Sequence, residues 1–289
     1  MPSTREIRNR IKSLKGTQQI TKAMKMVAAA KVRRAQDSVM STRPYAQKLK
    51  EMFQYVAYRL AEEEVNEPLL EQRAVQSIGF LIISSDKGLC GAYNSNVLRF
   101  ANRQMEEALS AGYTPKAWLV GNKAINFYRK GEVEILGRYA SLPAVPTYTE
   151  AEMLTEAVSS AFLEGKVDKV VLIYTDFVSM LQYTPSELQL LPVAPPEGDE
   201  APKAEYLYEP DPVTLLQNIL PRYIGRQILR SLLESATSEL AARMTAMDAA
   251  TKNADDLLDE LSTLYNKVRQ AYITKEILEV VGGAEALNQ

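Results

Sequence analysis

The fold is decided by residues 240–272, which read LAARMTAMDAATKNADDLLDELSTLYNKVRQAY. Mostly apolar residues recur there at alternating spacings of four and three, a heptad pattern typical of a helix in a left-handed coiled coil. The pattern predicts a long helix that begins at Asp211-Pro212, an N-cap followed by a first-turn proline, and runs to about Ala286. The predicted seam positions are Leu240, Met244, Met247, Thr251, Ala254, Leu258, Leu261, Tyr265, Val268 and Tyr272.

A second long helix is predicted at the other end of the chain. From Thr4 to about Arg59, Gly16 and Pro44 are the only glycine and proline among strong helix formers, and Pro44 marks a position where the helix can kink. Apolar residues recur at helical spacing. They are Ile7, Ile11, Leu14, Ile20, Met24, Val27, Ala28, Val32, Ala35 and Val39.

The charge of the chain is strongly polarised, although its net value is only −2. The first 50 residues hold thirteen Lys/Arg and two acids, a net charge of +11, whereas the remaining residues have a net charge of −13. From Glu239 onward there are nine acids and five bases. The two ends are therefore expected to pair as antiparallel helices, with charge selecting the partner because single surface ion pairs contribute only about 0–1 kcal/mol.

The middle of the chain alternates between strand and helix patterns. Strands are predicted at 75–84, 116–120, 132–139, 169–175 and 181–191. Helices are predicted near 97–111, after Gly121, and from a capping box at Thr149 and Glu152 to about Glu164. Residues 192–203, rich in proline, are predicted to form a surface loop. This alternation is typical of a βαβ sheet covered on both faces.

The predicted fold class is therefore α/β: a long antiparallel coiled coil of the N- and C-terminal helices plus a central Rossmann-like βαβ domain. Residues 1–60 and 211–289 are assigned to the coiled-coil shaft, and residues 70–210 to the globular α/β domain.

The composition removes several classes of site. The chain has no histidine, which excludes Ser-His and Cys-His nucleophilic pairs and histidine metal sites. Its single cysteine, Cys90, allows no intrachain disulfide and favours a reducing, intracellular setting. No apolar run approaches the roughly 20 residues that a membrane-spanning helix needs. These absences make a catalytic role less expected.

Two stretches leave alternatives open. Residues 84–94, SSDKGLCGAYN, lie between a predicted strand and helix, as phosphate-binding loops do, but lack both common glycine spacings. A structural turn is favoured there over a ligand site or a reactive Cys90. The basic N-terminal helix is compatible with a coiled-coil nucleic-acid-associated protein. It has no aromatic residue before Tyr45 to stack on bases, so a protein interface is favoured.

The C-terminal tip, residues 271–287, is apolar on more than one helical face. Ile273, Ile277, Leu278, Val280 and Val281 are too many to face one seam, which predicts a socket in another protein.

Three regions resemble the γ subunit of bacterial F-type ATP synthases. The first is the N-terminal pattern Ile7-Arg8-x-Arg10-Ile11-x-Ser13, continued by Thr17-Gln18-x-Ile20-Thr21-Lys22-Ala23-Met24-x-Met26-Val27-Ala28-Ala29. The second is Ser85-Asp86-x-Gly88-Leu89-Cys90-Gly91-x-x-Asn94. The third comprises Ala242-Arg243-Met244-x-Ala246-Met247, Tyr265-Asn266-Lys267-x-Arg269-Gln270 and Ile273-Thr274-x-Glu276-x-x-Glu279-x-x-x-Gly283-Ala284.

The resemblance implies a non-catalytic central-stalk subunit, with no catalytic residues, no metal site and no cofactor. This subunit couples ion flow through a membrane ring to ATP synthesis and hydrolysis by rotation. The implied partners are three α and three β subunits, the ε subunit and the ring of c subunits, with no nucleic acid. Membrane contact is implied only through the complex, peripherally, on the cytoplasmic side of a bacterial cell membrane. The short, cysteine-free 192–203 loop implies no thiol regulation, and a motif beginning near Met1 favours a bacterial source.

The resemblance also implies which residues contact these partners. Those implied to face the α/β hexamer are Arg8, Met24, Lys25, Arg269, Gln270, Thr274 and Glu276. Those implied to meet ε and the c-ring at the foot, within residues 206–211, are Tyr206, Tyr208 and Glu209.

Overall fold

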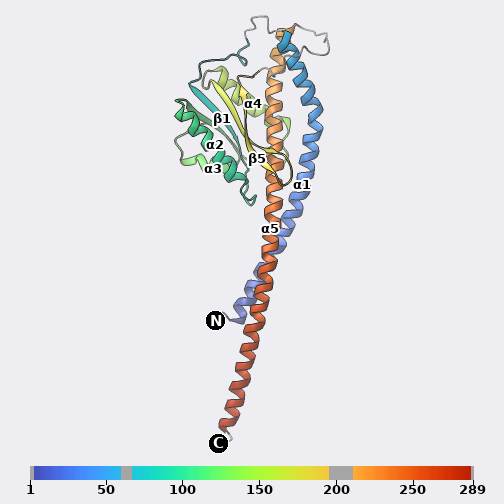
Figure 1. The fold of residues 1–289 in the computed structure, drawn as a ribbon, viewed down its shortest axis with the longest axis vertical. Helices are drawn as coiled ribbons and strands as arrows, with labels where there is room; N and C mark the ends of the chain where they lie inside the picture. The colour runs from blue at the N-terminus through green and yellow to red at the C-terminus, as the bar shows by residue number, and fades with distance from the viewer. Residues whose placement is uncertain (1–2, 60–66, 195–210, 288–289) are drawn as a thin grey trace. The chain divides into compact units, whose positions relative to one another are not determined.

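A computed structural model describes residues 3–59, 67–194 and 211–287 (Figure 1). The chain forms two compact units: unit 1 comprises Met1–Ala28 with Met244–Gln289, and unit 2 comprises Ala29–Arg243. These bounds differ from the predicted division at residues 60 and 211, which remains a proposal about function.

Two long helices, both predicted, contribute to both units. Helix α1 spans Thr4–Arg59 and contains Pro44, and helix α5 spans Pro212–Leu287 and contains Pro221. Asp211 begins α5 as predicted, because its carboxylate accepts hydrogen bonds from the backbone N–H groups of Val213 at 3.1 Å and Thr214 at 3.0 Å. The Thr214 backbone bond is the main reason why the pKa of Asp211 is lowered.

In unit 1 the two chain ends pair as antiparallel helices. Side-chain contacts join Lys25 to Asp248, Thr21 to Thr251, Gln18 to Asp255 and Arg8 to Tyr265, so residue numbers fall along α1 as they rise along α5. The predicted seam of α5 faces this contact: Met247, Ala254 and Leu258 are buried, and its other positions from Met244 to Val268 are half-buried. Tyr272, the last predicted seam position, is exposed.

Two of the apolar α1 residues that recur at helical spacing do not lie on its buried face. Ile20 and Val27 are 62% and 55% exposed, whereas Thr21 is buried and Gln18 and Lys25 are half-buried. The spacing that begins at Ile7, Ile11 and Leu14 continues in fours and threes through 18, 21, 25 and 28, whatever the polarity of those residues. A helix turns 100° per residue, so Ile20 and Val27 point away from that seam.

Unit 2 contains one five-stranded sheet in the order β3-β2-β1-β4-β5. The strands are β1 (Ser77–Ile83), β2 (Thr114–Val120), β3 (Glu134–Tyr139), β4 (Lys169–Phe177) and β5 (Tyr183–Leu191). Strand β1 pairs in parallel with β2 and β4, and β2 pairs in parallel with β3. Strand β5 is the antiparallel edge strand on β4. The alternation of strands and helices in the sequence thus correctly predicted an α/β unit.

The helices between the strands are α2 (Tyr93–Ser110), α3 (Asn122–Phe127), a 3₁₀ turn (Tyr128–Lys130) and α4 (Tyr148–Leu163). The capping box of α4 is formed by Thr147 and Glu150, not by Thr149 and Glu152. The Glu150 carboxylate accepts the Thr147 backbone N–H at 2.7 Å, which closes the box two residues earlier than predicted. The sequence TYTEAE contains the motif in both registers, and Thr147 has the extended backbone that an N-cap requires.

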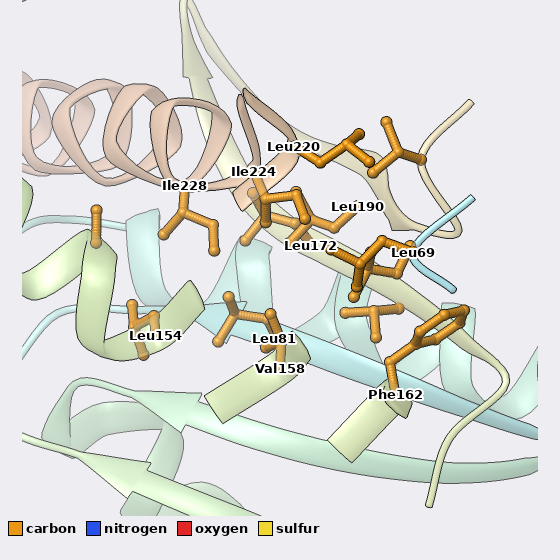
Figure 2. Close-up of a cluster of buried hydrophobic side chains, with 14 of the residues drawn as sticks. Leu69, Leu81, Leu154, Val158, Phe162, Leu172, Leu190, Leu220, Ile224 and Ile228 are labelled. Carbon is orange, nitrogen blue, oxygen red and sulfur yellow. The ribbon is translucent and has the colours of Figure 1, made fainter. Parts of the chain in front are cut away.

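Both faces of the sheet are covered by apolar cores within unit 2. One core joins α4, the α5 residues before 234 and part of α1 to the sheet, with Leu81 and Leu172 facing Leu154, Val158 and Ile228 (Figure 2). The other joins α2 and α3 to the opposite face of the sheet. These two cores fix the carboxyl ends of the parallel strands and the loops that follow them.

Candidate interaction surfaces

Polar side chains bridge the two helices of unit 1 at successive seam levels. The Arg8 guanidinium donates a hydrogen bond to the Tyr265 hydroxyl at 2.6 Å, and Lys25 Nζ lies 2.5 Å from an Asp248 carboxylate oxygen. Between these levels the Thr21 and Thr251 hydroxyls are 2.8 Å apart. Polar contacts at seam positions favour one register over its neighbours, because any shift would leave them unpaired.

The electrostatics of unit 1 follow from these pairs. The hydrogen bond from Lys25, aided by one from Lys252, lowers the pKa of Asp248. The hydrogen bond from Arg8 lowers the pKa of Tyr265, and Arg269 lowers it further. Asp248 and Tyr265 thus bind Lys25 and Arg8, two cations that the resemblance implies contact the α/β hexamer.

Two of the predicted hexamer contacts, Arg8 and Lys25, therefore already bind side chains of α5 within this chain's own helix pair. The Lys25 side chain is still 43% exposed, so part of its surface is available to another protein. Met24, next to it, is half-buried. The structure does not bring the predicted hexamer contacts together in one cluster. Lys25 lies beside Asp248, and Asp248 is about 30 Å from Arg269 along α5.

The four predicted hexamer contacts on α5 are all exposed: Arg269, Gln270, Thr274 and Glu276. Glu276 accepts a hydrogen bond from Tyr272, and this contact raises the pKa of that tyrosine. The predicted foot residues Tyr206, Tyr208 and Glu209 lie outside the described residues.

Unit 1 also presents apolar side chains on its surface. Ile20, Met26 and Val27 of α1 are exposed, and so are the large apolar side chains of the C-terminal tip, at 46–72%. The tip residues are Tyr272, Ile273, Ile277, Leu278, Val280 and Val281. Large apolar side chains that gather on one surface mark protein-interaction sites.

Thr251 was correctly predicted as a seam position, but contacts of Gln18 and Asp255 were not predicted. Gln18 lies on the heptad spacing that Ile7, Ile11 and Leu14 begin, but the prediction for α1 rested on apolar residues alone. Asp86 in unit 2 was also missed: its Oδ1 accepts hydrogen bonds from the backbone N–H groups of Asn122 at 3.0 Å and Ser141 at 3.1 Å.

The loop of residues 84–94 offers no reactive thiol. Cys90 is 2% exposed, and burial raises the pKa of its thiol, so the nucleophilic thiolate is disfavoured. Within residues 3–59, 67–194 and 211–287 no group of three or more acidic or cysteine side chains is placed to hold a metal ion. The helices of those same ranges include none long and apolar enough to cross a membrane.

Comparison with known proteins identifies the family. A family model described as ATP synthase matches residues 3–287. Two curated relatives, from a Synechococcus and a Nostoc species, are both named ATP synthase gamma chain. Each is 44% identical to this chain, and each alignment covers 99% of this chain and 100% of the relative.

Solved structures agree with this match. A chain from the central stalk and c-ring of the Tetrahymena thermophila mitochondrial ATP synthase is 27% identical, with a TM-score of 0.59 over 80% of this chain and 99% of that one. A rotor chain of the Euglena gracilis mitochondrial enzyme shares the fold, with a TM-score of 0.67 at 18% identity over 93% of this chain and 98% of that one. By its sequence, matched along nearly its whole length, and by its fold, this chain belongs to the ATP synthase gamma chain family.

Proposed function

We propose that this gamma chain is the central rotating shaft of an F-type ATP synthase. It couples ion flow through a membrane ring of c subunits to ATP synthesis and hydrolysis on a hexamer of three α and three β subunits. The observation that carries this proposal is the antiparallel pairing of the two chain ends in unit 1, in a chain that matches gamma chains over 99% of its length.

The shaft works through its asymmetry. In unit 1 the α1 residues hold seven bases and one acid, whereas residues 244–289 hold eight acids and four bases. Two paired helices of opposite charge present different faces to subunits arranged around them. As the shaft turns, each catalytic subunit meets a different face, and the differential contacts shift its conformational equilibrium.

The proposed hexamer contacts are Arg8, Met24 and Lys25 on α1 and Arg269, Gln270, Thr274 and Glu276 on α5. The exposure of the four α5 residues supports this assignment. Tyr206, Tyr208 and Glu209 are proposed to contact ε and the c-ring. The exposed apolar tip is proposed to turn in an apolar socket of the hexamer, which removes its side chains from water.

The gamma chain itself is proposed to catalyse no reaction, since nucleotides are bound and hydrolysed by its partners. Its membrane association is proposed to be peripheral and to depend on the complex, on the cytoplasmic side of a bacterial membrane.

Co-purification tests this proposal. A tagged gamma chain expressed in its native cell is expected to bring down two larger nucleotide-binding subunits, each in threefold excess, together with ε. Recovery of the chain alone, or with nucleic acid that high salt removes, would contradict it. The nucleic-acid alternative has no support among the related proteins, which are gamma chains of ATP synthases.

A further inference from the structure

Unit 2 contains a cavity of about 280 Å³ at the carboxyl ends of its parallel strands. Its wall includes Ser84 after β1, Gly121 after β2, residues 142–146 after β3, and α5 residues from Leu232 to Arg243. In the order β3-β2-β1-β4-β5 the chain leaves β1 toward β2 on one side and later places β4 on the other. Open α/β sheets bind ligands at such a switch point, outside the carboxyl ends of the strands.

Helix α5 fills part of this crevice and limits the size of a ligand. Its Ser235 hydroxyl accepts the backbone N–H of Thr175 at 3.1 Å, near the end of β4, and Ser238 donates to the Thr175 carbonyl at 3.4 Å. The remaining volume lies just below the roughly 300–1,000 Å³ of drug-sized ligand pockets. It suits one phosphate group and excludes a dinucleotide.

The acidic side chains of the cavity wall are already engaged. Asp86 Oδ1 accepts three hydrogen bonds, two of them from Asn122, whose Nδ2 lies 2.9 Å away. Glu239 forms an ion pair with Arg243, and Arg243 also donates to the Gly88 carbonyl at 3.0 Å. The charge of Glu239 is thus paired with that of Arg243, whereas Asp86 keeps its charge and its Oδ1 is occupied by neutral donors.

The two lysines of the same wall are not engaged in this way. Among the described residues, neither Lys31 nor Lys87 donates a hydrogen bond or forms an ion pair within 4 Å, although Lys31 acts on Glu239 through space. Both side chains are exposed enough to reach a ligand at the mouth of the cavity. The cavity thus has an excess of unpaired positive charge.

The loop after β1 adds backbone donors. The N–H groups of Asp86 and Lys87, which both line the cavity, find no acceptor within the described parts of the chain. Consecutive unpaired N–H groups in a turn form concavities that bind anions.

We propose that this cavity binds a single phosphate group, held by Lys31, Lys87 and backbone N–H groups of the loop after β1. The phosphate is either free orthophosphate or the terminal phosphate of a nucleotide, since both present the same charge and the same acceptor oxygens. This site would make unit 2 a sensor of phosphate or nucleotide, separate from the contacts proposed for unit 1.

Calorimetric titration of the purified full-length chain tests the site, with orthophosphate and ADP as separate probes. We expect one binding event per chain, weakened about tenfold or more in Lys31→Ala and Lys87→Ala, because each loses a charge-assisted hydrogen bond. Lys87→Arg should retain most of the binding. Lys130→Ala, an exposed lysine outside the cavity, is the matched control for lost charge and should bind as the wild type does.

The two probes separate the sources of the phosphate. Tighter binding of orthophosphate identifies the free ion as the ligand, and tighter binding of ADP, in competition with orthophosphate, identifies a nucleotide. Circular dichroism and melting temperatures establish that each variant is folded. The proposal is overturned if neither probe binds the folded wild type, or if Lys87→Ala and Lys130→Ala bind equally well.

Discussion

Lys25 occupies a seam position of α1 that heptad logic would give to an apolar residue. Its ion pair with Asp248 is partly exposed, with 43% and 33% of the two side chains accessible, so water screens the pair and it contributes little to the stability of unit 1. We therefore expect Lys25 to set the register of the two helices or to contact the hexamer, rather than to stabilise unit 1.

A charge swap separates these two roles. Lys25→Glu places a second carboxylate against Asp248, and we expect it to lower the melting temperature slightly and to reduce ATP-driven proton pumping. The double variant Lys25→Glu with Asp248→Lys restores the internal pair with its polarity reversed. If the hexamer contacts the positive charge of Lys25, proton pumping stays low in the double variant although its melting temperature recovers.

Recovery of pumping in the double variant would show that Lys25 acts only within the gamma chain. Lys252→Gln is the matched control, because it removes the other cation bound to Asp248 at 3.1 Å and leaves Lys25 in place. It is expected to pump as the wild type does.

Gly79 in β1 makes room for Trp118 of the neighbouring strand. A Cβ at this position would lie 2.8 Å from Trp118 Cη2 and 3.2 Å from Val167 Cγ1, in a fully buried part of the sheet. We expect Gly79→Ala to lower the free energy of unfolding by about 1–3 kcal/mol through overpacking, measured by urea denaturation. Gly16→Ala, where nothing lies within 4 Å, should instead raise it by about 0.5–1 kcal/mol. Equal changes in the free energy of unfolding for Gly79→Ala and Gly16→Ala would contradict the overpacking explanation.

At the scale of elements, the two long helices, of 56 and 76 residues, could be predicted from the sequence because helical periodicity is sustained over many turns in each, across residues 7–39 and 240–272. Short-range signals were less secure. The α4 cap depends on which of two threonines adopts an extended backbone, which local sequence does not decide. Likewise, the partners of Lys25 and Arg8 depend on the register between distant segments. The exposure of the C-terminal tip, by contrast, followed directly from its apolar residues on several faces.

Helix α5 meets strand β4 through a buried acid. Glu234 is 7% exposed, its Oε1 accepts Arg230 Nε at 2.7 Å, and its Oε2 has no donor among the described residues. Burial raises the pKa of Glu234, Arg230 opposes this shift, and Asp176 adds to it. Tyr174 is the remaining ionisable neighbour. A protonated Glu234 would donate its proton to the Asp176 carboxylate.

This contact makes stability depend on pH. Because the folded state holds the Glu234 proton more tightly than the unfolded state, its contribution is fully present below the ordinary pKa of about 4.5 and is lost as pH rises through the folded value. Glu234→Gln replaces the carboxyl group by an amide, which can donate a hydrogen bond to Asp176 at every pH. We expect the variant to melt above the wild type at pH 8 and close to it at pH 4.5. Parallel melting curves across this range would contradict the assignment.

At the scale of the whole molecule, the chain is basic over its first 50 residues and acidic over the rest, and its basic and acidic ends pair in unit 1. In a rotating shaft these two ends have to turn as one body, because torque applied to one helix is otherwise lost in sliding against the other. Small polar side chains such as Thr21 and Thr251 meet along the seam of unit 1, and a pair of cysteines of similar size can replace them and form a disulfide.

Thr21→Cys with Thr251→Cys tests whether the ends turn together. The two hydroxyl oxygens are 2.8 Å apart, so a disulfide should form with little backbone movement. Buried Cys90, whose thiol pKa is raised, should not compete for it. We expect oxidation to change the mobility of the chain on a non-reducing gel while ATP-driven proton pumping stays within about twofold of the reduced enzyme, since a locked pair transmits torque at least as well. Each single variant is the control for the substitutions themselves. Pumping that falls on oxidation and returns with dithiothreitol would mean that the helices must move against each other during turnover, and the rigid-shaft mechanism would then be wrong.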